Sequence, residues 1–275
     1  MTNAEKILSD EELDSLTNAI KQRYGIDFTN YERKSLKRGF ARLVMRNQWD
    51  SILPLWSKIM SDREFFKGCI DELTVNLTEL FRNPEIWIKM KEDILPQYMF
   101  KSRLKMWHAG CSSGEEVYTM AIVLKSLRML NKAKSLGTDL SVSILEQAKI
   151  GEYSNILMKK YISSFSKFLP DGDLNDSFEF GDEFLKIKPD LKRHVTFEKH
   201  NLVQDEMNQK FDVIFCRNVM IYFDDGLKMK VLKRFYDSLD DNGFFIIGYY
   251  DMLPTESKEL FKVYDLKTRI YKKVI

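Results

Sequence analysis

Short apolar runs alternate with helical segments from about Leu104 to the end of the 275-residue chain. The β-rich runs "LKMWHA", "FDVIFC" and "GFFIIG" are separated by segments with helical spacing, such as "EEVYTMAIVLKSLRML". This alternation is typical of βαβ units, in which helices connect parallel strands. Strands that are apolar throughout suit a parallel sheet covered on both faces, and such sheets bind ligands beyond the carboxyl ends of their strands. We therefore predict an α/β domain with a ligand site at that edge.

The first 75 residues have a helical pattern instead. The stretch "SDEELDSLTNAIKQRYG" begins with Ser9 or Asp10 as a candidate N-cap and ends at Gly25. In "TNYERKSLKRGFARLVMRN", one apolar stripe recurs at helical spacing and consists of Leu36, Phe40, Leu43 and Val44. We predict a small all-α domain over residues 1–75, a linker helix region over 76–103 and the α/β domain over 104–275.

The alternating pattern weakens between Gly151 and Asp190, where turn residues mix with short alternating runs. We interpret this part as an insertion into the α/β domain, with a small antiparallel β-subdomain at about residues 160–192.

Composition excludes several classes of protein. Hydrophobic residues make up 44% of the chain and charged residues 31%, which argues against both disorder and a membrane protein. The N-terminal stretch lacks the apolar core of a secretory signal, and no run approaches the roughly 18 apolar residues of a membrane span. The three cysteines form no CxxC pair and the three histidines add no ligand spacing, so we expect neither disulfides nor a metal site. We expect a cytoplasmic monomer.

The turn "AGCSSGEE" lies between a predicted strand and a predicted helix. Gly110 and Gly114 let the backbone bend tightly and approach a ligand, and Ser113 is a candidate cap for the helix that follows. The turn lacks the full GxGxxG pattern, and many α/β proteins contain such a turn as plain architecture. Glu115 and Glu116 occupy the first helical turn, where they would repel a pyrophosphate. The turn therefore favours a neutral or ammonium-bearing ligand over a dinucleotide.

Asp139 ends the next short strand, "SLGTDL". An acidic residue at this place is well suited to accept hydrogen bonds from both hydroxyls of a ribose. A role as a helix cap is the alternative that the spacing leaves open. A ribose and an ammonium group without phosphates describe S-adenosylmethionine, so a methyltransferase fold is the leading hypothesis.

Three stretches together resemble the chemotaxis-receptor glutamate methyltransferases, the CheR family. They are "TVNLTELFRNPEIW", "WHAGCSSGEEVYTMAI" and "FDVIFCRNVMIYFDD". Further stretches follow in the family's order, so the likeness covers nearly the whole chain: "GTDLSVSILEQAKIGEY", "FEKHNLV" and "LDDNGFFIIGYYD". The resemblance implies a class I S-adenosylmethionine-dependent, Rossmann-like methyltransferase domain with a small inserted β-subdomain, preceded by a small all-α domain.

The resemblance also implies which residues bind S-adenosylmethionine and its product S-adenosylhomocysteine. They are Asn76, Thr78, Arg82, Gly110, Glu116, Asp139, Asn201, Leu202, Cys216, Arg217 and Asn218. By analogy with the family, Asp139 holds the ribose, and Asn201 and Leu202 flank the adenine. Cys216, Arg217 and Asn218, the "CRN" residues, line the methionine end of the cofactor.

The family's acceptor is a glutamate side chain, which is already ionised at neutral pH and can attack the methyl group without a general base. Catalysis then depends mainly on geometry. We predict that Arg82 and Tyr222 position the acceptor carboxylate, through a guanidinium and a phenol hydroxyl. The alternative for Tyr222 is an ordinary core aromatic residue.

Basic residues form a stripe on the second predicted helix, and they are Lys34, Lys37, Arg38, Arg42 and Arg46. In the family the corresponding helix is thought to meet the acidic methylation region of the receptor's cytoplasmic helices. A merely solvated face is the alternative; nucleic acid is less favoured because the stripe lacks interleaved aromatic residues.

The chain departs from the family pattern at Leu80, at Val117 and in "GYYD", which includes Tyr249 and Tyr250. These departures leave two rival functions open. One is a methyltransferase for another acceptor, such as RNA or a small carboxylic acid. The other is a non-catalytic signalling module that binds S-adenosylmethionine or S-adenosylhomocysteine.

Overall fold

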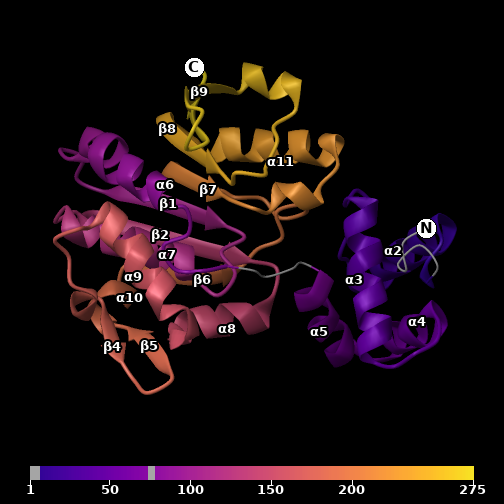
Figure 1. The fold of residues 1–275 in the computed structure, drawn as a ribbon. Helices are drawn as coiled ribbons and strands as arrows, with labels where there is room; N and C mark the ends of the chain where they lie inside the picture. The colour runs from indigo at the N-terminus through magenta and orange to yellow at the C-terminus, as the bar shows by residue number, and fades with distance from the viewer. Residues whose placement is uncertain (1–6, 74–77) are drawn as a thin grey trace.

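The computed structural model describes residues 7–73 and 78–275, which form a helical domain beside a larger α/β domain (Figure 1). The helices of the first domain are α2 (Asp10–Tyr24), α3 (Arg33–Arg46), α4 (Ile52–Ser61) and α5 (Arg63–Leu73). Their apolar faces meet in one core that includes Leu16, Phe40 and Leu55. Helix α2 begins with a capping box, in which Ser9 and Glu12 bond each other's backbone amides, and it ends at the left-handed Gly25.

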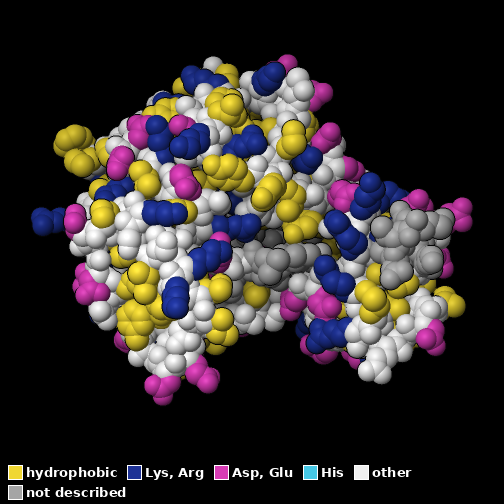
Figure 2. Space-filling model, viewed as in Figure 1, with side chains coloured by type: hydrophobic (Ala, Val, Ile, Leu, Met, Phe, Trp, Pro, Cys, Tyr) yellow, Lys and Arg dark blue, Asp and Glu magenta, His cyan; other side chains and the backbone are white. Residues whose placement is uncertain are grey.

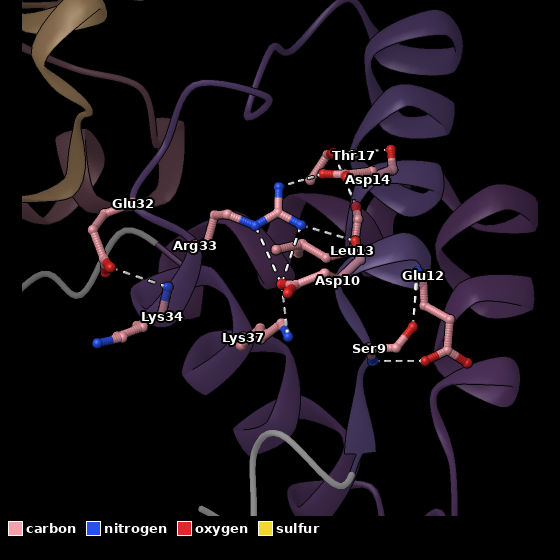
Figure 3. A network of polar contacts seen from close by, with 10 residues as sticks. All are labelled: Ser9, Asp10, Glu12, Leu13, Asp14, Thr17, Glu32, Arg33, Lys34 and Lys37. Carbon is pink, nitrogen blue, oxygen red and sulfur yellow. Dashed lines mark hydrogen bonds and ion pairs between the residues drawn. The ribbon is translucent and has the colours of Figure 1, made fainter. Parts of the chain in front are cut away.

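Ion pairs join the start of α3 to the start of α2 (Figure 3). Arg33 lies 3.2 Å from Asp10 and 2.5 Å from Asp14, and Lys37 Nζ lies 2.9 Å from Asp10. Such surface pairs contribute little free energy, but together they favour one orientation of the two helices. Lys34 points away from this cluster (Figure 3).

The second domain is built on a seven-stranded sheet with the order β6-β2-β1-β7-β8-β10-β9. The strands from β6 to β8 in this order are parallel, and β10 and β9 complete the sheet in antiparallel fashion. The strand bounds are β1 (Leu104–Ala109), β2 (Ala133–Asp139), β6 (Val195–Lys199), β7 (Phe211–Cys216), β8 (Leu239–Ile247), β9 (Phe261–Asp265) and β10 (Ile270–Lys273). The predicted α/β class with a largely parallel sheet is confirmed.

Helices cover both faces of this sheet, as the apolar strands require (Figure 1). On β7, Val213 and Phe215 pack into the core beneath α7, whereas Ile214 and Cys216 pack into the core beneath α11. The α-helices of this domain are α6 (Pro84–Lys89), α7 (Glu115–Ser126), α8 (Val142–Ile150), α9 (Met158–Phe168), α10 (Pro189–Lys192) and α11 (Asp225–Ser238). The short helical turns are the π-helix Met90–Ile94 and the 3₁₀ turns Leu95–Tyr98, Leu130–Lys132, Asn155–Leu157, Leu174–Asp176, Met220–Tyr222 and Thr255–Glu259.

A separate antiparallel sheet with the order β3-β5-β4 lies in the inserted region. Its strands are β3 (Glu152–Ser154), β4 (Phe178–Phe180) and β5 (Phe184–Ile187). The sheet therefore begins at Glu152, before the expected range of about 160–192, because β3 follows directly on the end of α8. The sequence pattern is weak here since β3 and β4 are each three residues long.

The linker is less helical than the sequence suggested. Residues Thr78 to Asn83 form no helix, and α6 begins at Pro84, a position where proline's missing amide costs nothing. Over the described residues, no helix is both long enough and apolar enough to cross a bilayer.

Candidate active site

A cavity lies at the carboxyl ends of β1, β2 and β7, where the helical domain meets the α/β domain. Most of the predicted site residues line it, and these are Thr78, Arg82, Gly110, Glu116, Asp139, Asn201, Leu202, Arg217, Asn218 and Tyr222. Cys216 does not, because its side chain is fully buried in the core beneath α11. Asn76 lies outside the described residues.

The glycine turn brings the backbone close to this cavity. Gly110 has a φ of 75°, and a Cβ there would lie 2.4 Å from Val219 Cγ2, so only glycine fits. Gly114, also left-handed, is the N-cap of α7. Ser113 does not cap the helix as predicted, because its hydroxyl instead donates a hydrogen bond to the Glu115 carboxylate at 2.8 Å.

Asp139 is held at the end of β2 with its carboxylate at the cavity wall. The amide of Ser112 donates to Asp139 Oδ2 at 2.9 Å and the amide of Ser141 donates to Oδ1 at 3.1 Å. Burial raises the pKa of Asp139, although these backbone donors oppose the effect. Ser141 caps α8 by accepting from the Ile144 amide, so the alternative role of Asp139 as that cap is wrong. The remaining lone pairs of the carboxylate suit a pair of ribose hydroxyls.

Glu116 is the carboxylate of the turn that faces the cavity. Its Oε1 lies 2.9 Å from His108 Nδ1, and its Oε2 accepts from Arg217 Nη1 at 2.9 Å. Burial alone would raise its pKa, but these two partners outweigh that effect and lower the pKa. Arg217 also donates to Asn83 Oδ1 at 2.7 Å and lies over the Trp87 ring. The network holds a negative charge rigidly at the cavity wall.

Glu115 does not face the cavity, which corrects the expectation that both carboxylates lie at its mouth. Only 7% of the residue is exposed, and burial raises its pKa to about 7 against the effect of hydrogen bonds from Ser113 and Thr78. The repulsion of phosphates by this turn therefore depends on Glu116 alone.

The raised pKa of Glu115 predicts a pH-dependent stability. A shift of the pKa from 4.5 to about 7 means that ionised Glu115 lowers the folding stability by about 3 kcal/mol. This loss is not felt below the unfolded-state pKa, and it is fully felt above pH 7. We expect Glu115→Gln to raise the free energy of unfolding at pH 8 and to change it little at pH 5, measured by urea denaturation. Glu146→Gln, on the exposed surface of α8, is the control. An equal effect of Glu115→Gln at both pH values would contradict the prediction.

Arg82 lies between two residues in the left-handed region, Phe81 with φ 60° and Asn83 with φ 55°. Such a backbone is strained for residues other than glycine and persists only when the surroundings impose it. The Phe81 ring is fully buried and its amide donates to Thr119 Oγ1 at 3.2 Å. The indole of Trp87 donates to the Arg82 carbonyl at 3.0 Å. These contacts place the Arg82 backbone at the cavity wall.

Tyr222 lines the cavity, and it is also partly buried against the core beneath α11, so it is not solely a core aromatic residue. Burial raises the pKa of its hydroxyl, whereas the positive charges of Arg42, Arg82 and Arg38 oppose that rise. The hydroxyl is therefore protonated at neutral pH and available as a hydrogen-bond donor.

Asp251 supports the site from outside the cavity lining, and no sequence motif indicated this role. Its buried carboxylate accepts from the amides of Asn218 at 2.7 Å, Gly248 at 2.8 Å and Ile221 at 3.0 Å. It thus ties the loop that carries Asn218 and Tyr222 to the end of β8. Its place as the acid of "GYYD" was the available signal. Gly248 belongs to the same stretch, but Asn218 and Ile221 lie on a loop that only the fold brings close to Asp251.

Several other cavity residues were also missed, namely Tyr31, Glu79, Trp87, Cys111, Ser112, Leu140, His200, Val219 and Phe223. Most of them adjoin predicted residues in the chain, so the quoted motifs could have indicated them. Tyr31 belongs to the helical domain, and no motif pointed to it.

The cavity fits S-adenosylmethionine on the chemistry of its walls. It offers a buried carboxylate with lone pairs for a ribose, a turn that admits no Cβ, and a fixed anion at Glu116 for an ammonium group. Arg82 and Arg217 supply positive charge for a carboxylate. Fold and site together define a class I S-adenosylmethionine-dependent methyltransferase domain.

Comparison with known proteins identifies the family. Residues 76–270 match the S-adenosylmethionine-binding domain of CheR methyltransferases, and residues 11–74 match their all-alpha domain. The chain therefore belongs to the CheR methyltransferase family, and S-adenosylmethionine is its cofactor.

Curated relatives support the same assignment. The chemotaxis protein methyltransferase of Listeria innocua is 31% identical over 235 residues, which cover 84% of this chain and 86% of the relative. The chemotaxis protein methyltransferase of Vibrio anguillarum is 30% identical, with 90% of each chain covered. That of Borreliella burgdorferi is 35% identical over 196 residues, or 67% of each chain.

Proposed function

We propose that the protein is a protein-glutamate O-methyltransferase that methylates glutamate side chains of chemoreceptors. The relatives named above are chemotaxis methyltransferases, which supports this class of acceptor. The observation that carries the proposal is that Arg82 and Tyr222 line the same cavity and that the charge of Arg82 acts on the Tyr222 hydroxyl, since a guanidinium and a neutral phenol can together orient a carboxylate.

The chemistry demands little of the protein beyond orientation. Bound S-adenosylmethionine supplies an electrophilic methyl group on a sulfonium centre. A glutamate carboxylate with a pKa near 4.3 is already a nucleophile at neutral pH, so no residue has to remove a proton. Arg82 and Tyr222 hold the carboxylate in line for attack, and partial burial of the site limits its solvation by water.

A second cavity supports a path for the acceptor. It is lined by Arg82, Asn83, Glu85, Asn218, Tyr249 and Tyr250, so it shares Arg82 and Asn218 with the first cavity. Tyr250 is 77% exposed and stands at its rim. We propose that the acceptor side chain enters here and that Tyr249 and Tyr250, which depart from the family pattern, contact the residues around it.

The basic stripe of α3 supports docking of an acidic receptor segment, and Figure 2 shows Lys and Arg side chains on the part of the helical domain that faces the α/β domain. Fewer of the five basic residues are available to a partner than the sequence suggested. Lys37 is paired with Asp10 and its side chain is only 11% exposed, while Arg46 is paired with Glu72. Arg42 donates to the Glu72 carbonyl at 2.9 Å. We therefore centre the proposed receptor surface on Lys34, Arg38 and Arg42.

Charge reversal on this stripe should weaken receptor binding. We expect Lys34→Glu combined with Arg38→Glu to raise the KM for receptor at least tenfold at low salt, with a smaller effect in high salt, because opposite charges attract across such interfaces. Cofactor affinity should not change. Lys258→Glu combined with Lys262→Glu, two exposed residues near the C-terminal strands, changes the net charge by the same amount and is the matched control. An equal KM for the double variant and the control would contradict the proposed surface.

The proposed activity is tested by incubating the protein and labelled S-adenosylmethionine with membranes that contain chemoreceptors. Label that alkali releases as methanol would identify a carboxyl methyl ester and support the proposal. Label that resists alkali, or transfer to RNA or a small carboxylic acid instead, would identify another acceptor. Tight cofactor binding without transfer to any of these would favour a signalling module.

A further inference from the structure

The helical domain contributes a side chain to the cofactor cavity. Among the described residues that line this cavity, Tyr31 is the one that precedes the linker. It lies just before the N-cap of α3, far in sequence from Asp139, yet both line the same cavity.

Tyr31 is held firmly at the contact between the two domains. Its ring packs edge-to-face against Phe28 of its own domain at 5.0 Å and against Phe223 of the α/β domain at 5.1 Å. An antiparallel β-bridge joins Tyr31 to Phe223.

Two backbone hydrogen bonds flank this bridge. The amide of Glu32 donates to the Tyr222 carbonyl at 2.7 Å, and the amide of Asp224 donates to the Asn30 carbonyl at 3.0 Å. The position of the Tyr31 ring in the cavity therefore depends on the docking of the two domains.

The hydroxyl of Tyr31 is a hydrogen-bond donor without a protein acceptor in the part of the chain that the structure describes. Burial raises its pKa, and the nearby charge of Asp139 raises it further, so the group stays protonated. A donor in the same cavity as Asp139 complements that acceptor, because each ribose hydroxyl can both donate and accept.

We propose that Tyr31 is a cofactor-binding residue whose hydroxyl donates a hydrogen bond to a ribose oxygen of S-adenosylmethionine. The cofactor then contacts both domains at once. Because such coupling is reciprocal, the bound nucleoside strengthens the docking of the helical domain, and docking strengthens cofactor binding. The inference rests on the cofactor and not on the identity of the acceptor.

The variant Tyr31→Phe tests the proposal, since it removes the hydroxyl and keeps the ring contacts with Phe28 and Phe223. We expect a three- to tenfold higher Kd for S-adenosylhomocysteine by calorimetry, the range for one hydrogen bond. Tyr24→Phe is the matched control, because the Tyr24 hydroxyl bonds the Ile59 carbonyl inside the helical domain. Its Kd should equal that of the wild type.

Hydrogen exchange supplies a second measurement. S-adenosylhomocysteine should slow exchange of the Glu32 and Asp224 amides, which bond across the domain contact, and should slow it less in Tyr31→Phe. A Kd for Tyr31→Phe within twofold of the wild type would overturn the proposal. Equal weakening in Tyr31→Phe and Tyr24→Phe would also overturn it, because the loss would then reflect stability of the helical domain.

Discussion

Asp139→Ala is expected to raise the Kd for S-adenosylhomocysteine about 100-fold. Two hydrogen bonds from ribose hydroxyls to a carboxylate in a buried site would each contribute about 1.5 kcal/mol or more, and alanine removes both. The substitution also frees the Ser112 amide, which Asp139 holds at the glycine turn. Calorimetric titration with S-adenosylhomocysteine measures the effect directly.

Two controls separate cofactor contact from local unfolding. Asp139→Asn keeps one acceptor oxygen and should weaken binding less than alanine does. Ser141→Ala removes the cap of α8 in the same loop but leaves the Asp139 carboxylate in place, so its Kd should stay near that of the wild type. Equal affinity of wild type and Asp139→Ala would show that Asp139 does not bind the ribose.

Tyr222→Phe should leave cofactor affinity unchanged and slow methyl transfer about 10- to 100-fold in a single turnover. The phenol hydroxyl is protonated at neutral pH and Tyr222 lines the same cavity as Arg82, so its loss removes one of the two groups that we propose orient the acceptor. Rapid-quench measurement with receptor in excess of enzyme reports the rate of this step.

Arg82→Ala is the reference variant for this experiment. Because the resemblance assigns Arg82 to both the acceptor and the cofactor, alanine there should lower both the rate and cofactor affinity, whereas Tyr222→Phe should lower the rate alone. A single-turnover rate of Tyr222→Phe equal to that of the wild type would remove Tyr222 from the catalytic residues.

Regular patterns made the architecture predictable. The apolar runs of β1, β7 and β8 and the helical stripes of α2 and α3 are long enough to show their periodicity, so the helical domain and the parallel sheet followed from them. The inserted sheet was harder to predict from the sequence, because strands such as β3 have too few residues to show a periodic pattern. The conformation of the segment before Pro84 was harder still to predict, since buried contacts with distant side chains hold its residues in the left-handed backbone region.

The site residues also differ in whether local sequence pattern or tertiary contacts determine their positions. Gly110, Glu116 and Asp139 could be predicted because strand ends and helix starts in a βαβ unit lie at one edge of the sheet by rule. The separation of Glu115 from Glu116 could not, since it depends on which way each side chain leaves the first turn of α7 and what covers it.

Local periodicity and motif order thus determined the class of fold, the family and the region of the cofactor site. The tertiary structure alone decided that Asp251 binds the amides of Asn218 and Ile221, that Lys37 pairs with Asp10, and that Tyr31 reaches the cavity from the other domain. The reason is that these features depend on contacts between segments far apart in the chain. Burial and hydrogen-bond partners, which set the charge state and orientation of a side chain, exist only after those segments have packed.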